Sequence, residues 1–411
     1  MDNPEVKIVV GANYGDEGKG LATHYFSQKA KNEGKKCLNV LYNGGPQRGH
    51  TVELSNGIKH IFHHFGSGLF DGAQTCFDQD FMINPIVFME ELKDLSKVIH
   101  YYPSVPEIIS DPKAYIHPSC RIITPYDIFI NQIVEESRGD ERHGSCGSGI
   151  WETQQRYLNW PHSIPFGRLI RKDDIYIREH LISIRDTYAV KRLKEYGIEE
   201  VPDKFKELWY STNLIDHYIY DLRSMEAEVE LCEFENLILN YDTIIFEGGQ
   251  GLALDEDNLE ACPHVTASKT GSEIPVKKMV NWSDDIEICY VSRSYFTRHG
   301  PGPFPTEIPW HGESDTTNVE NQFQGKLRYG SFDRFEFFRR VCNDFWRSML
   351  SGVKGSYTCD TPKLKKSVML THMDPDNMNC NYILSAIMPE FQKVYVSETR
   401  YADDVKVVKG E

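Results

Sequence analysis

The chain has 411 residues, 40% of them hydrophobic and 12% aromatic, and its formal net charge is −16. This length and composition support a large folded core, whereas the acidic balance and the lack of a Lys/Arg-rich run argue against long nucleic acids as partners. The ten cysteines are scattered without a CxxC pair, and no apolar run reaches the roughly 18 residues of a membrane span, so we expect a reduced cytoplasmic protein with no membrane contact.

Short apolar runs rich in β-branched residues recur at 6–12, 38–43, 242–248, 286–294, 366–374 and 392–397. Runs of this kind are typical of strands buried on both faces of a parallel sheet. Segments with helical spacing lie between them, at 18–31, 125–137, 203–223 and 332–350. The pattern predicts an α/β fold, interpreted as a single large domain over residues 1–411 with a mostly parallel central sheet flanked by helices.

The first predicted strand runs straight into a glycine-rich loop, VVGANYGDEGKG, at residues 9–20. Its glycines let the backbone approach a polyphosphate, Lys19 can neutralise charge, and the following helix directs its first N–H groups at the ligand. The loop differs from a Walker A loop because it is longer and because Gly20, not Ser or Thr, follows the lysine. Asp16 is unexpected, since phosphate repels a carboxylate unless that carboxylate binds a metal or removes a proton. The alternative interpretation is a tight turn capped by Asp16.

A second glycine-rich segment, NGGPQRGHT, occupies residues 43–51 after the next predicted strand. Its position in a loop predicts that His50 is an exposed, mobile imidazole, suited to stabilising a transferring phosphoryl group. The alternative is an ordinary surface histidine.

Two further segments carry polar groups that suit a nucleotide. RHGSCGSGIWET (142–153) has the small residues of an anion nest, with Ser145 and Cys146 as candidates, unless it is merely a flexible glycine loop. FEGGQGLALDEDNLEACPHVTASKT (246–270) contains Gln250, whose amide can both donate to and accept from a base edge. The acidic run at 255–257 is interpreted as a solvated loop in preference to a metal site.

The last third of the chain adds TRHGPGPFPTE (297–307), NQFQGKLRYGSFD (321–333), LTHMD (370–374) and SETRYADD (397–404). Arg328 offers the planar, bidentate chemistry that suits a carboxylate. Asp374 supplies a carboxylate, which can accept two hydrogen bonds from one ligand.

Taken in order, these segments resemble the signatures of adenylosuccinate synthetases, which condense L-aspartate with a 6-oxopurine nucleotide using GTP and Mg²⁺. The resemblance runs from residue 9 to about residue 400 and is poor over 155–240. It implies a homodimer and a reaction in which the purine O6 is phosphorylated before aspartate displaces the phosphate. In that reaction Asp16 removes the N1 proton, Lys19 guides the γ-phosphate, and His50 is the catalytic acid.

The resemblance also implies which residues contact each ligand. For the nucleoside triphosphate donor these are Gly15, Gly18, Lys19, Gly20, Thr51, Asp374 and Ser397. For the purine monophosphate they are Asp16, Gln47, Ser145, Cys146, Gln250, Thr266 and Lys326. Gln324 and Arg328 would bind L-aspartate, while Asp16 and the carbonyl of Gly49 would bind Mg²⁺. Arg156 or Arg168 would complete the partner subunit's nucleotide site.

The chain departs from the family at several of these positions. Cys146 replaces a threonine, Leu327 and Tyr329 interrupt an arginine run, and His372 replaces a lysine that covers the donor guanine. The final loop, SETRYADD, lacks the family's Gly-Pro, so GTP and ATP both stay open as donors. Because a thinned arginine run should relax the reading of the ribose 2′-OH, we favour GMP or dGMP as acceptor. A phage-type branch of the family uses dGMP to make a precursor of diaminopurine DNA, and such an enzyme would act in the host cytoplasm.

Two alternatives stay open. One is an ordinary IMP-dependent adenylosuccinate synthetase, because inosinate and guanylate share N1–H and O6. The other is a nucleotide-binding sensor without the chemistry, against which stands the joint presence of Asp16, Lys19, His50, Gln250 and Arg328. A P-loop GTPase is disfavoured by the missing Ser or Thr after Lys19.

Overall fold

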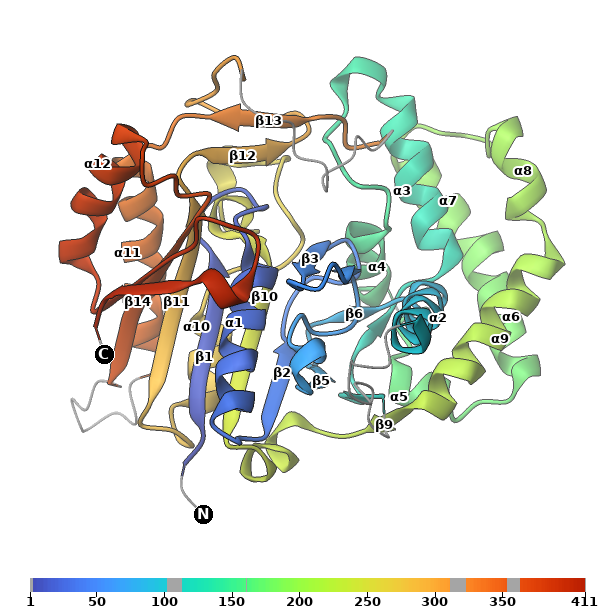
Figure 1. The fold of residues 1–411 in the computed structure, drawn as a ribbon. Coiled ribbons are helices and arrows are strands. Elements are labelled where there is room, and N and C mark those ends of the chain that lie inside the picture. Colours follow the sequence, from blue (N-terminus) through green and yellow to red (C-terminus); the bar gives the residue numbers. More distant parts are fainter. Residues whose placement is uncertain (1–2, 102–112, 160, 311–322, 353–362, 411) are drawn as a thin grey trace.

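The protein is described from a computed structural model, which covers residues 3–101, 113–159, 161–310, 323–352 and 363–410. Its centre is a ten-stranded sheet (Figure 1). In spatial order the strands are β16 (Lys406–Lys409), β15 (Lys393–Val396), β14 (Leu364–Thr371), β11 (Ile286–Arg293), β1 (Glu5–Gly11), β10 (Thr243–Gly251), β2 (Cys37–Leu41), β5 (Gln74–Phe77), β7 (Ala114–Ile116) and β9 (Val229–Leu231). Every neighbouring pair is parallel except β15 and β16 at one edge. The predicted α/β fold with a mostly parallel sheet is confirmed.

The six apolar runs predicted as strands form the contiguous centre of this sheet, from β15 to β2. All residues of β2 and β11 are buried. Strands covered on both faces need an almost unbroken apolar sequence, which is why these six were visible in advance. The four strands that the sequence did not reveal, β5, β7, β9 and β16, are only three or four residues long.

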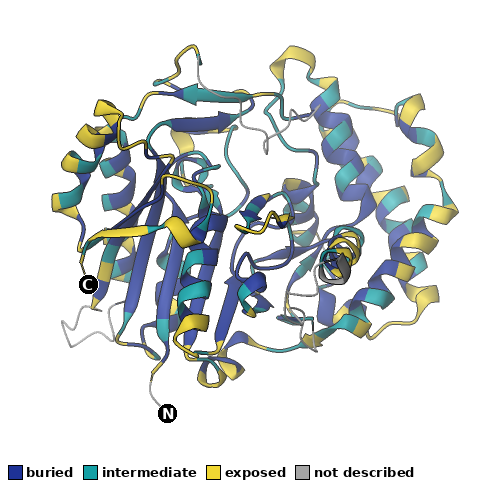
Figure 2. Ribbon diagram, in the orientation of Figure 1, coloured by how far each residue is buried: buried dark blue, intermediate teal, exposed yellow. Residues whose placement is uncertain are grey.

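Alternate residues of the central strands contact different layers of helices, because side chains along a strand point to opposite faces. Val9 packs with Ala22 and Phe26 of α1 (Lys19–Asn32). Ile8 and Val10 belong to the opposite apolar cluster. Helices α10 (Glu273–Met279), α11 (Arg334–Ser351) and α12 (Met378–Ile387) contribute to that cluster. The sheet is therefore covered on both faces (Figures 1 and 2).

A second large apolar cluster lies at the β9 end of the sheet, where most of the remaining helices gather (Figure 1). The helices in this part of the chain are α2 (Pro85–Tyr101), α3 (Pro125–Ser137), α4 (Ile150–Tyr157), α5 (Phe166–Leu169), α6 (Asp174–Ser183), α7 (Val190–Glu195), α8 (Asp203–Trp209) and α9 (Thr212–Glu228). The predicted helix 125–137 is α3, which begins with a capping box between Thr124 and Asp127. The predicted helix 203–223 is instead two helices, because Ser211 starts a new one by accepting the N–H of Leu214.

Three two-stranded sheets are also described: β3 (His50–Glu53) with β4 (Lys59–Phe62), β12 (Phe296–His299) with β13 (Leu327–Gly330), and β6 (Met82–Ile83) with β8 (Arg121–Ile122). Two of them bear on the site, because β3 begins with His50 and β12 ends with His299.

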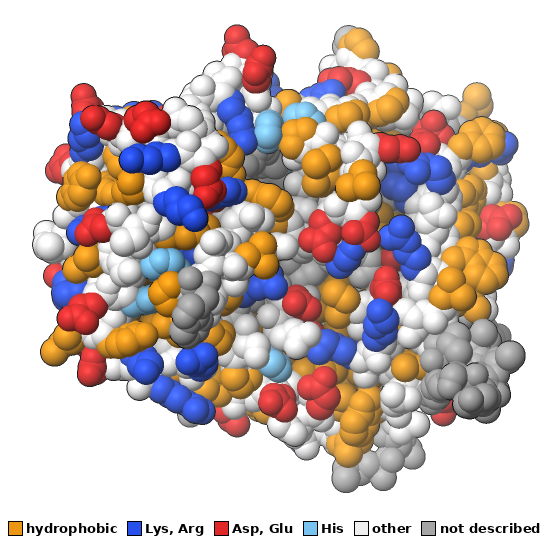
Figure 3. Space-filling model, turned by 180° about the vertical axis from the view of Figure 1, so that it is seen from behind, with side chains coloured by type: hydrophobic (Ala, Val, Ile, Leu, Met, Phe, Trp, Pro, Cys, Tyr) orange, Lys and Arg blue, Asp and Glu red, His pale blue; other side chains and the backbone are white. Residues whose placement is uncertain are grey.

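The nine cysteines within the described ranges are free thiols. Within the same ranges, none of the helices combines the length and apolarity that a membrane crossing requires. On the face seen in Figure 3, Lys and Arg side chains are interspersed with Asp and Glu. The described residues of that face therefore form no continuous basic patch.

The β3–β4 hairpin is anchored to α2 by a buried carboxylate and a buried imidazole. Glu91 accepts the backbone N–H of His63 at 3.0 Å and that of His64 at 2.5 Å. The Nε2 of His64 accepts the backbone N–H of Asn84 at 3.1 Å, and the ring packs against Phe88. Burial lowers the pKa of His64 to about 3, against the opposing charge of Glu91.

This anchor predicts an acid sensitivity. An unfolded histidine titrates near 6.5, so the stability that neutral His64 provides is complete above pH 6.5 and is lost as the pH falls toward 3. Between pH 7 and pH 5 the unfolding free energy of the native protein should fall by about 2 kcal/mol more than that of His64→Gln, which keeps an acceptor but does not titrate. Denaturant unfolding at both pH values measures this, and equal losses in the two proteins would contradict it.

Candidate functional site

The opening loop joins β1 to α1 and is organised around the buried carboxylate of Glu17. One oxygen accepts the backbone N–H of Asn13 at 3.0 Å and of Gly15 at 2.8 Å, and the other lies 2.8 Å from Nζ of Lys19. Burial raises the pKa of Glu17, but the charge of Lys19 and the accepted hydrogen bonds outweigh burial and hold the pKa below its usual value. Lys19 therefore has a carboxylate partner within its own loop.

Asp16 stands beside this ion pair with a φ of 61°, a conformation that few residues other than glycine adopt. Neighbouring strands hold it there: Arg293 donates to the carbonyl of Asp16, and Thr297 Oγ1 donates to the carbonyl of Gly15 at 3.0 Å. The Asp16 side chain is 19% exposed and lies 3.5 Å from Nε2 of His299. Helix α1 has no side-chain cap, so the structure does not support the alternative interpretation of Asp16 as a helix cap. Strained residues of this kind are common at ligand sites.

The loop is fastened on both sides. Gly251 at the end of β10 packs so closely that a Cβ there would lie 2.3 Å from the carbonyl oxygen of Asn13. From α11, Arg340 donates to the side-chain oxygen of Asn13 at 2.8 Å. Gln250, predicted to face the purine, therefore lies next to the opening loop.

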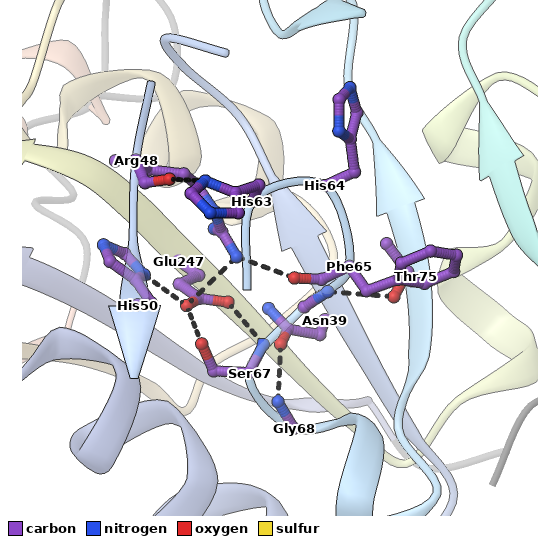
Figure 4. A network of polar contacts seen from close by, with 12 residues as sticks. Asn39, Arg48, His50, His63, His64, Phe65, Ser67, Gly68, Thr75 and Glu247 are labelled. Carbon is purple, nitrogen blue, oxygen red and sulfur yellow. Dashed lines mark hydrogen bonds and ion pairs between the residues drawn. The ribbon is translucent and has the colours of Figure 1, made fainter. Parts of the chain in front are cut away.

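His50 is buried and held in place, not exposed and mobile as its loop position predicted. Its Nδ1 lies 2.6 Å from Oε1 of Glu247 on β10, a residue 197 positions away (Figure 4). Burial and the charge of Arg48 lower the pKa of His50 to about 4, so the ring is neutral and donates its Nδ1–H to Glu247. Within the described residues the buried Nε2 has no hydrogen-bond partner, so it is the ring nitrogen that stays available.

Arg48 completes this network (Figure 4). Its Nη2 donates to the carbonyl of Phe65 at 2.8 Å and lies 3.5 Å from Oε1 of Glu247. The same carboxylate accepts the N–H and the hydroxyl of Ser67. Burial alone would raise the pKa of Glu247, but the charge of Arg48 and the hydrogen bonds from His50 and Ser67 lower it to about 2. Glu247 is therefore an ionised, buried support for His50.

Strand β3 packs against the first turn of α1, and Gly20 makes this approach possible. A Cβ on Gly20 would lie 3.0 Å from the carbonyl oxygen of Thr51 and 3.1 Å from the Cβ of His50. The charge of Lys19 also contributes to the lowered pKa of His50. The structure thus brings together four residues predicted to act on the donor phosphates: Lys19, Gly20, His50 and Thr51.

The segment 142–149, predicted to be a phosphate nest, directs part of its hydrogen bonding to its own chain. The N–H groups of Gly144 and Ser145 point at Glu135, at 3.0 Å and 3.4 Å, and Ser145 Oγ donates to Asn131 at 2.9 Å. Cys146 Sγ lies 3.1 Å from the hydroxyl of Ser148.

A cavity of about 370 Å³ separates this segment from the segment 43–51, and its lining includes Cys146, Ser148, Pro46 and Phe323. Gln47 follows Pro46, and both polar atoms of its amide are buried without a hydrogen-bond partner in the described structure. A buried amide left unpaired is costly, and a bound ligand would satisfy it. The cavity therefore joins two segments predicted to bind the purine monophosphate.

The predicted aspartate-binding loop lies against these segments, although Asn321 and Gln322 at its start fall outside the described residues. The carbonyl of Gln324 approaches Gly300, and Lys326 is exposed. Arg328 is occupied within its own chain: Nη1 donates to the carbonyls of Gly300 at 3.0 Å and Gly302 at 2.9 Å, and Nε donates to Glu307 at 2.9 Å. Aspartate could use this guanidinium only by displacing Glu307.

The residues predicted to bind the donor base lie at the ends of β14 and β15. Thr371 Oγ1 donates to the carbonyl of Glu17 at 2.8 Å, which connects β14 to the opening loop. Ser397 is tied to the same strand end, because its carbonyl accepts the N–H of Met373 at 3.1 Å. Asp374 is exposed, and His372 has a φ of 54°.

Two further positions from the sequence analysis make hydrogen bonds within the segment 246–270. Thr266 is half-buried and donates its N–H to Leu254 at 2.8 Å. In the acidic run, Asp255 accepts the N–H of Thr270 at 2.6 Å, so it braces its own loop.

Only one of the two candidate arginines is exposed. Arg156 is buried, with Nε 2.8 Å from Asp127 and Nη1 2.6 Å from the carbonyl of His162. Arg168 on α5 is exposed.

Sequence reasoning gave no role to Glu17, Glu247, Arg48 or His299. A signal was present for Glu247, because a lone carboxylate inside an apolar run that is buried on both faces must have a partner. The sequence held no comparable signal for His299, which reaches Asp16 only through the docking of β12.

A parallel sheet with glycine-rich and polar loops at the carboxyl ends of its strands is the arrangement of nucleotide-binding α/β proteins. The family model for adenylosuccinate synthetase matches residues 8–330, and the chain belongs to this family.

Curated relatives agree with this membership. Adenylosuccinate synthetase of Acetivibrio thermocellus is 28% identical over 319 residues, and that of Geobacter metallireducens is 30% identical over 305 residues; each match covers 73% of this chain and 65% of the relative. The chain thus spans about two thirds, at 65%, of the length of these curated relatives.

Two solved structures share the fold. Fully ligated adenylosuccinate synthetase from Plasmodium falciparum has a TM-score of 0.68 and 19% identity, covering 98% of this chain and 100% of its own. Cyanophage S-2L succinoaminodeoxyadenylate synthetase (PurZ), bound to dGMP and to dATP as energy donor, has a TM-score of 0.59 and 15% identity, covering 99% and 96%.

Measurements of the unfolding free energy can test whether Arg48 stabilises the buried charge of Glu247. Arg48→Met should lower the unfolding free energy by about 3 kcal/mol at pH 7, because a buried carboxylate loses its cation. Adding Glu247→Gln to that variant should restore part of the loss, because no uncompensated charge then stays buried. Denaturant unfolding of the two single variants and the double variant measures the coupling, and strictly additive losses would contradict it.

Proposed function

We propose that the protein is a C–N ligase that joins L-aspartate to C6 of a 6-oxopurine nucleoside monophosphate, driven by a nucleoside triphosphate. The observation that supports this best is the meeting of Lys19, Gly20, His50 and Thr51 around the first turn of α1, with Asp16 three residues before Lys19. A nucleotide sensor would need the glycines and the lysine. It would not need an imidazole held by a buried glutamate beside them.

The proposed chemistry has two steps. Asp16 accepts the N1 proton of the purine, and O6 then attacks the γ-phosphorus of the donor, whose bond to the bridging oxygen breaks. Lys19 stabilises the charge on the transferring group, and His50 contacts it through Nε2. The amino group of aspartate next attacks C6, and the C6–O bond breaks to release phosphate. His50 acts as an acid only when protonated at Nε2, and the charge of a bound polyphosphate favours that form.

The residues present fit a magnesium ion. Asp16 offers a carboxylate that is 19% exposed, and Gly49, next to His50, is an exposed residue whose carbonyl can serve as a second ligand. Mg²⁺ prefers oxygen ligands and is usually held by one or two carboxylates together with substrate phosphates. When bound, it would neutralise charge on the donor phosphates.

We further propose GMP or dGMP as acceptor. The support comes from Lys326, Leu327 and Tyr329 in place of an arginine run, and from Cys146 in the phosphate segment. The structural likeness to a synthetase bound to dGMP agrees with this choice, whereas the curated relatives' names favour IMP equally well. The donor is GTP or ATP: Asp374 suits guanine, while the likeness to a dATP-bound structure favours adenine.

The active form is proposed to be a homodimer, because a partner's arginine would complete the nucleotide site. Arg168 suits this role and Arg156 does not, since Arg168 is exposed on α5 whereas Arg156 is buried against Asp127.

Side-by-side assays test the ligase. IMP, GMP and dGMP, each with L-aspartate, Mg²⁺ and either GTP or ATP, should give phosphate release and a succinylated nucleotide detected by mass. Asp16→Asn and His50→Asn should each lower turnover by about 100-fold or more while nucleotide affinity changes little. If both variants bound nucleotide normally and no combination gave product in the native protein, the sensor interpretation would replace the ligase.

The proposed binding of aspartate by Arg328 predicts a change in the KM for aspartate alone. Arg328→Leu should raise the KM for aspartate by about tenfold or more and leave the nucleotide KM unchanged, because a charged hydrogen bond to one substrate is lost. Glu307→Gln should lower the KM for aspartate by up to about fivefold, because aspartate no longer has to displace an exposed ion pair, and such pairs contribute about this much. Arg334→Leu, on the exposed start of α11, is the matched control. If the KM for aspartate stayed constant in Arg328→Leu, the proposed binding of aspartate by Arg328 would be contradicted.

A further inference from the structure

A cavity outside the proposed active site lies between α1, the turn of the β3–β4 hairpin and residues 401–403. We infer that this cavity binds a small alkyl diammonium compound, for which 1,4-diaminobutane serves as the probe, and that this ligand strengthens binding of the nucleoside triphosphate donor. The effect on the donor rests on the proposed function, whereas the binding itself does not.

The cavity has a volume of about 220 Å³ and is built from four segments. Helix α1 lines it with His24, Gln28 and Lys31, which share one face of the helix because they are four and three residues apart. The other walls come from residues 53–56, from residues 70–71 and from residues 401–403, which lie against α1 (Figure 1). At about 30 Å³ for each water, the volume corresponds to about seven waters, or to one small organic molecule.

Two side chains that line the cavity are buried without a hydrogen bond in the described structure. The side chain of Asp71 is only 6% exposed, and its Oδ2 has no hydrogen-bond partner. Nε2 of His24 lies 3.1 Å from this oxygen without hydrogen-bond geometry, and neither ring nitrogen has a hydrogen bond. Lys31 is 3.6 Å from Oδ1 and is itself half exposed. A carboxylate buried in this way is costly unless donors reach it, so the site favours a ligand that brings a charged donor.

The rest of the lining decides which kind of cation fits. Glu53 and the exposed Asp403 add two carboxylates to that of Asp71, against one ammonium group among the lining residues. Phe70 and Ala402 bring buried apolar surface to the same cavity. A methylene chain can contact this apolar surface while an ammonium group at each end meets a carboxylate, whereas a bare metal ion uses only the oxygens. Within the described ranges, acidic, histidine and cysteine side chains form no group of three that could hold a metal ion.

A ligand of this kind would hold the C-terminal loop 397–404 against α1 and β3. In the structure the loop reaches α1 through Gln28, which donates to Asp403 at 2.7 Å. It reaches β3 through Arg400 and Tyr401, each 3.4 Å from an oxygen of Glu53. These contacts are exposed or long, so they contribute little. Glu53 and Asp403 also carry like charges in one cavity, and an ammonium group between them removes that repulsion.

The segments that meet at the cavity all lead to the proposed donor site. Lys19 begins α1 and His50 begins β3. Ser397 begins the loop, where its Oγ donates to the carbonyl of Thr399 at 2.6 Å, and Thr399 Oγ1 donates to Asp404 at 2.7 Å. A ligand that stabilises the docked loop therefore lowers the cost of ordering these residues around the donor, which is a positive coupling between two sites.

Titration calorimetry of the full chain with 1,4-diaminobutane at fixed ionic strength tests the site. The native protein should bind one equivalent, about tenfold or more tightly than it binds butylamine, which lacks the second ammonium group. Asp71→Asn keeps the shape of the side chain and should weaken binding by about tenfold or more, because a charged hydrogen bond is lost. Asp403→Asn should weaken it by up to about fivefold, because that ion pair is exposed. Glu199→Gln removes the same charge from the exposed surface outside the cavity and should keep the native affinity.

Three results would overturn the site. The first is the absence of binding at millimolar diamine. The second is an affinity that Asp71→Asn leaves unchanged. The third is equally tight binding of Mg²⁺, because net charge alone would then explain the result. If Asp71→Asn fails to fold, Asp403→Asn and the comparison with butylamine decide in its place.

A second titration, with GTP or ATP in the presence and absence of saturating 1,4-diaminobutane, tests the coupling. The diamine should tighten donor binding by about fivefold, at the lower end of typical couplings, and the donor should tighten diamine binding by the same factor. A donor affinity that bound diamine leaves unchanged would overturn the coupling. A protein that binds neither nucleotide refutes the proposed function, while the titration with diamine still judges the cavity.

Discussion

The structure of the site depends on one buried ion pair, Glu17 with Lys19. A buried carboxylate is stable only when its charge and its lone pairs are matched, and Glu17 meets this condition with the N–H groups of Asn13 and Gly15 and the ammonium of Lys19. The condition fixes the path of the opening loop. Neighbouring elements then dock on fixed carbonyls: Thr297 on Gly15, and Thr371 of β14 on Glu17 itself. This chain of contacts positions the proposed base and the loops proposed to bind the donor.

The centre of the fold could be predicted from the sequence because its strands are buried on both faces. Such strands leave an apolar run in the sequence, and all six runs are adjacent in the sheet. The outer strands were missed because segments of three or four residues are too short to show a periodic apolar pattern. The break between α8 and α9 was missed for a different reason: helical spacing continues across it, and a single serine cap at Ser211 decides the boundary.

The candidate site shows the same division between local and distant information. Glycine spacing and a strand before it were enough to predict the opening loop around Asp16 and Lys19. The state of His50 could not be predicted, because the carboxylate that buries and orients it lies 197 residues away. Arg48 is next to His50 in sequence, yet its role as counterion to Glu247 exists only through the sheet. Local patterns therefore identify reactive side chains, whereas the partners that set their charge require the fold.

The proposed function requires an acidic protein to bind several anions, so its own carboxylates must not block the proposed sites. The burial of two of these carboxylates distinguishes their roles. Glu135, only 1% exposed as a side chain, holds the N–H groups of Gly144 and Ser145 from inside the fold. Its Oε1 pairs with Arg138, and its Oε2, which accepts those N–H groups, would be left buried without hydrogen bonds if they moved away. Glu135 therefore acts as permanent scaffolding for this segment. Glu307 is 45% exposed where it pairs with Arg328. Water can replace its partner at little cost, so a substrate carboxylate can displace it. Under the proposed function, this difference in exposure gives two chemically identical groups opposite roles: Glu135 shapes the proposed phosphate site, and Glu307 occupies the proposed aspartate site until a ligand displaces it.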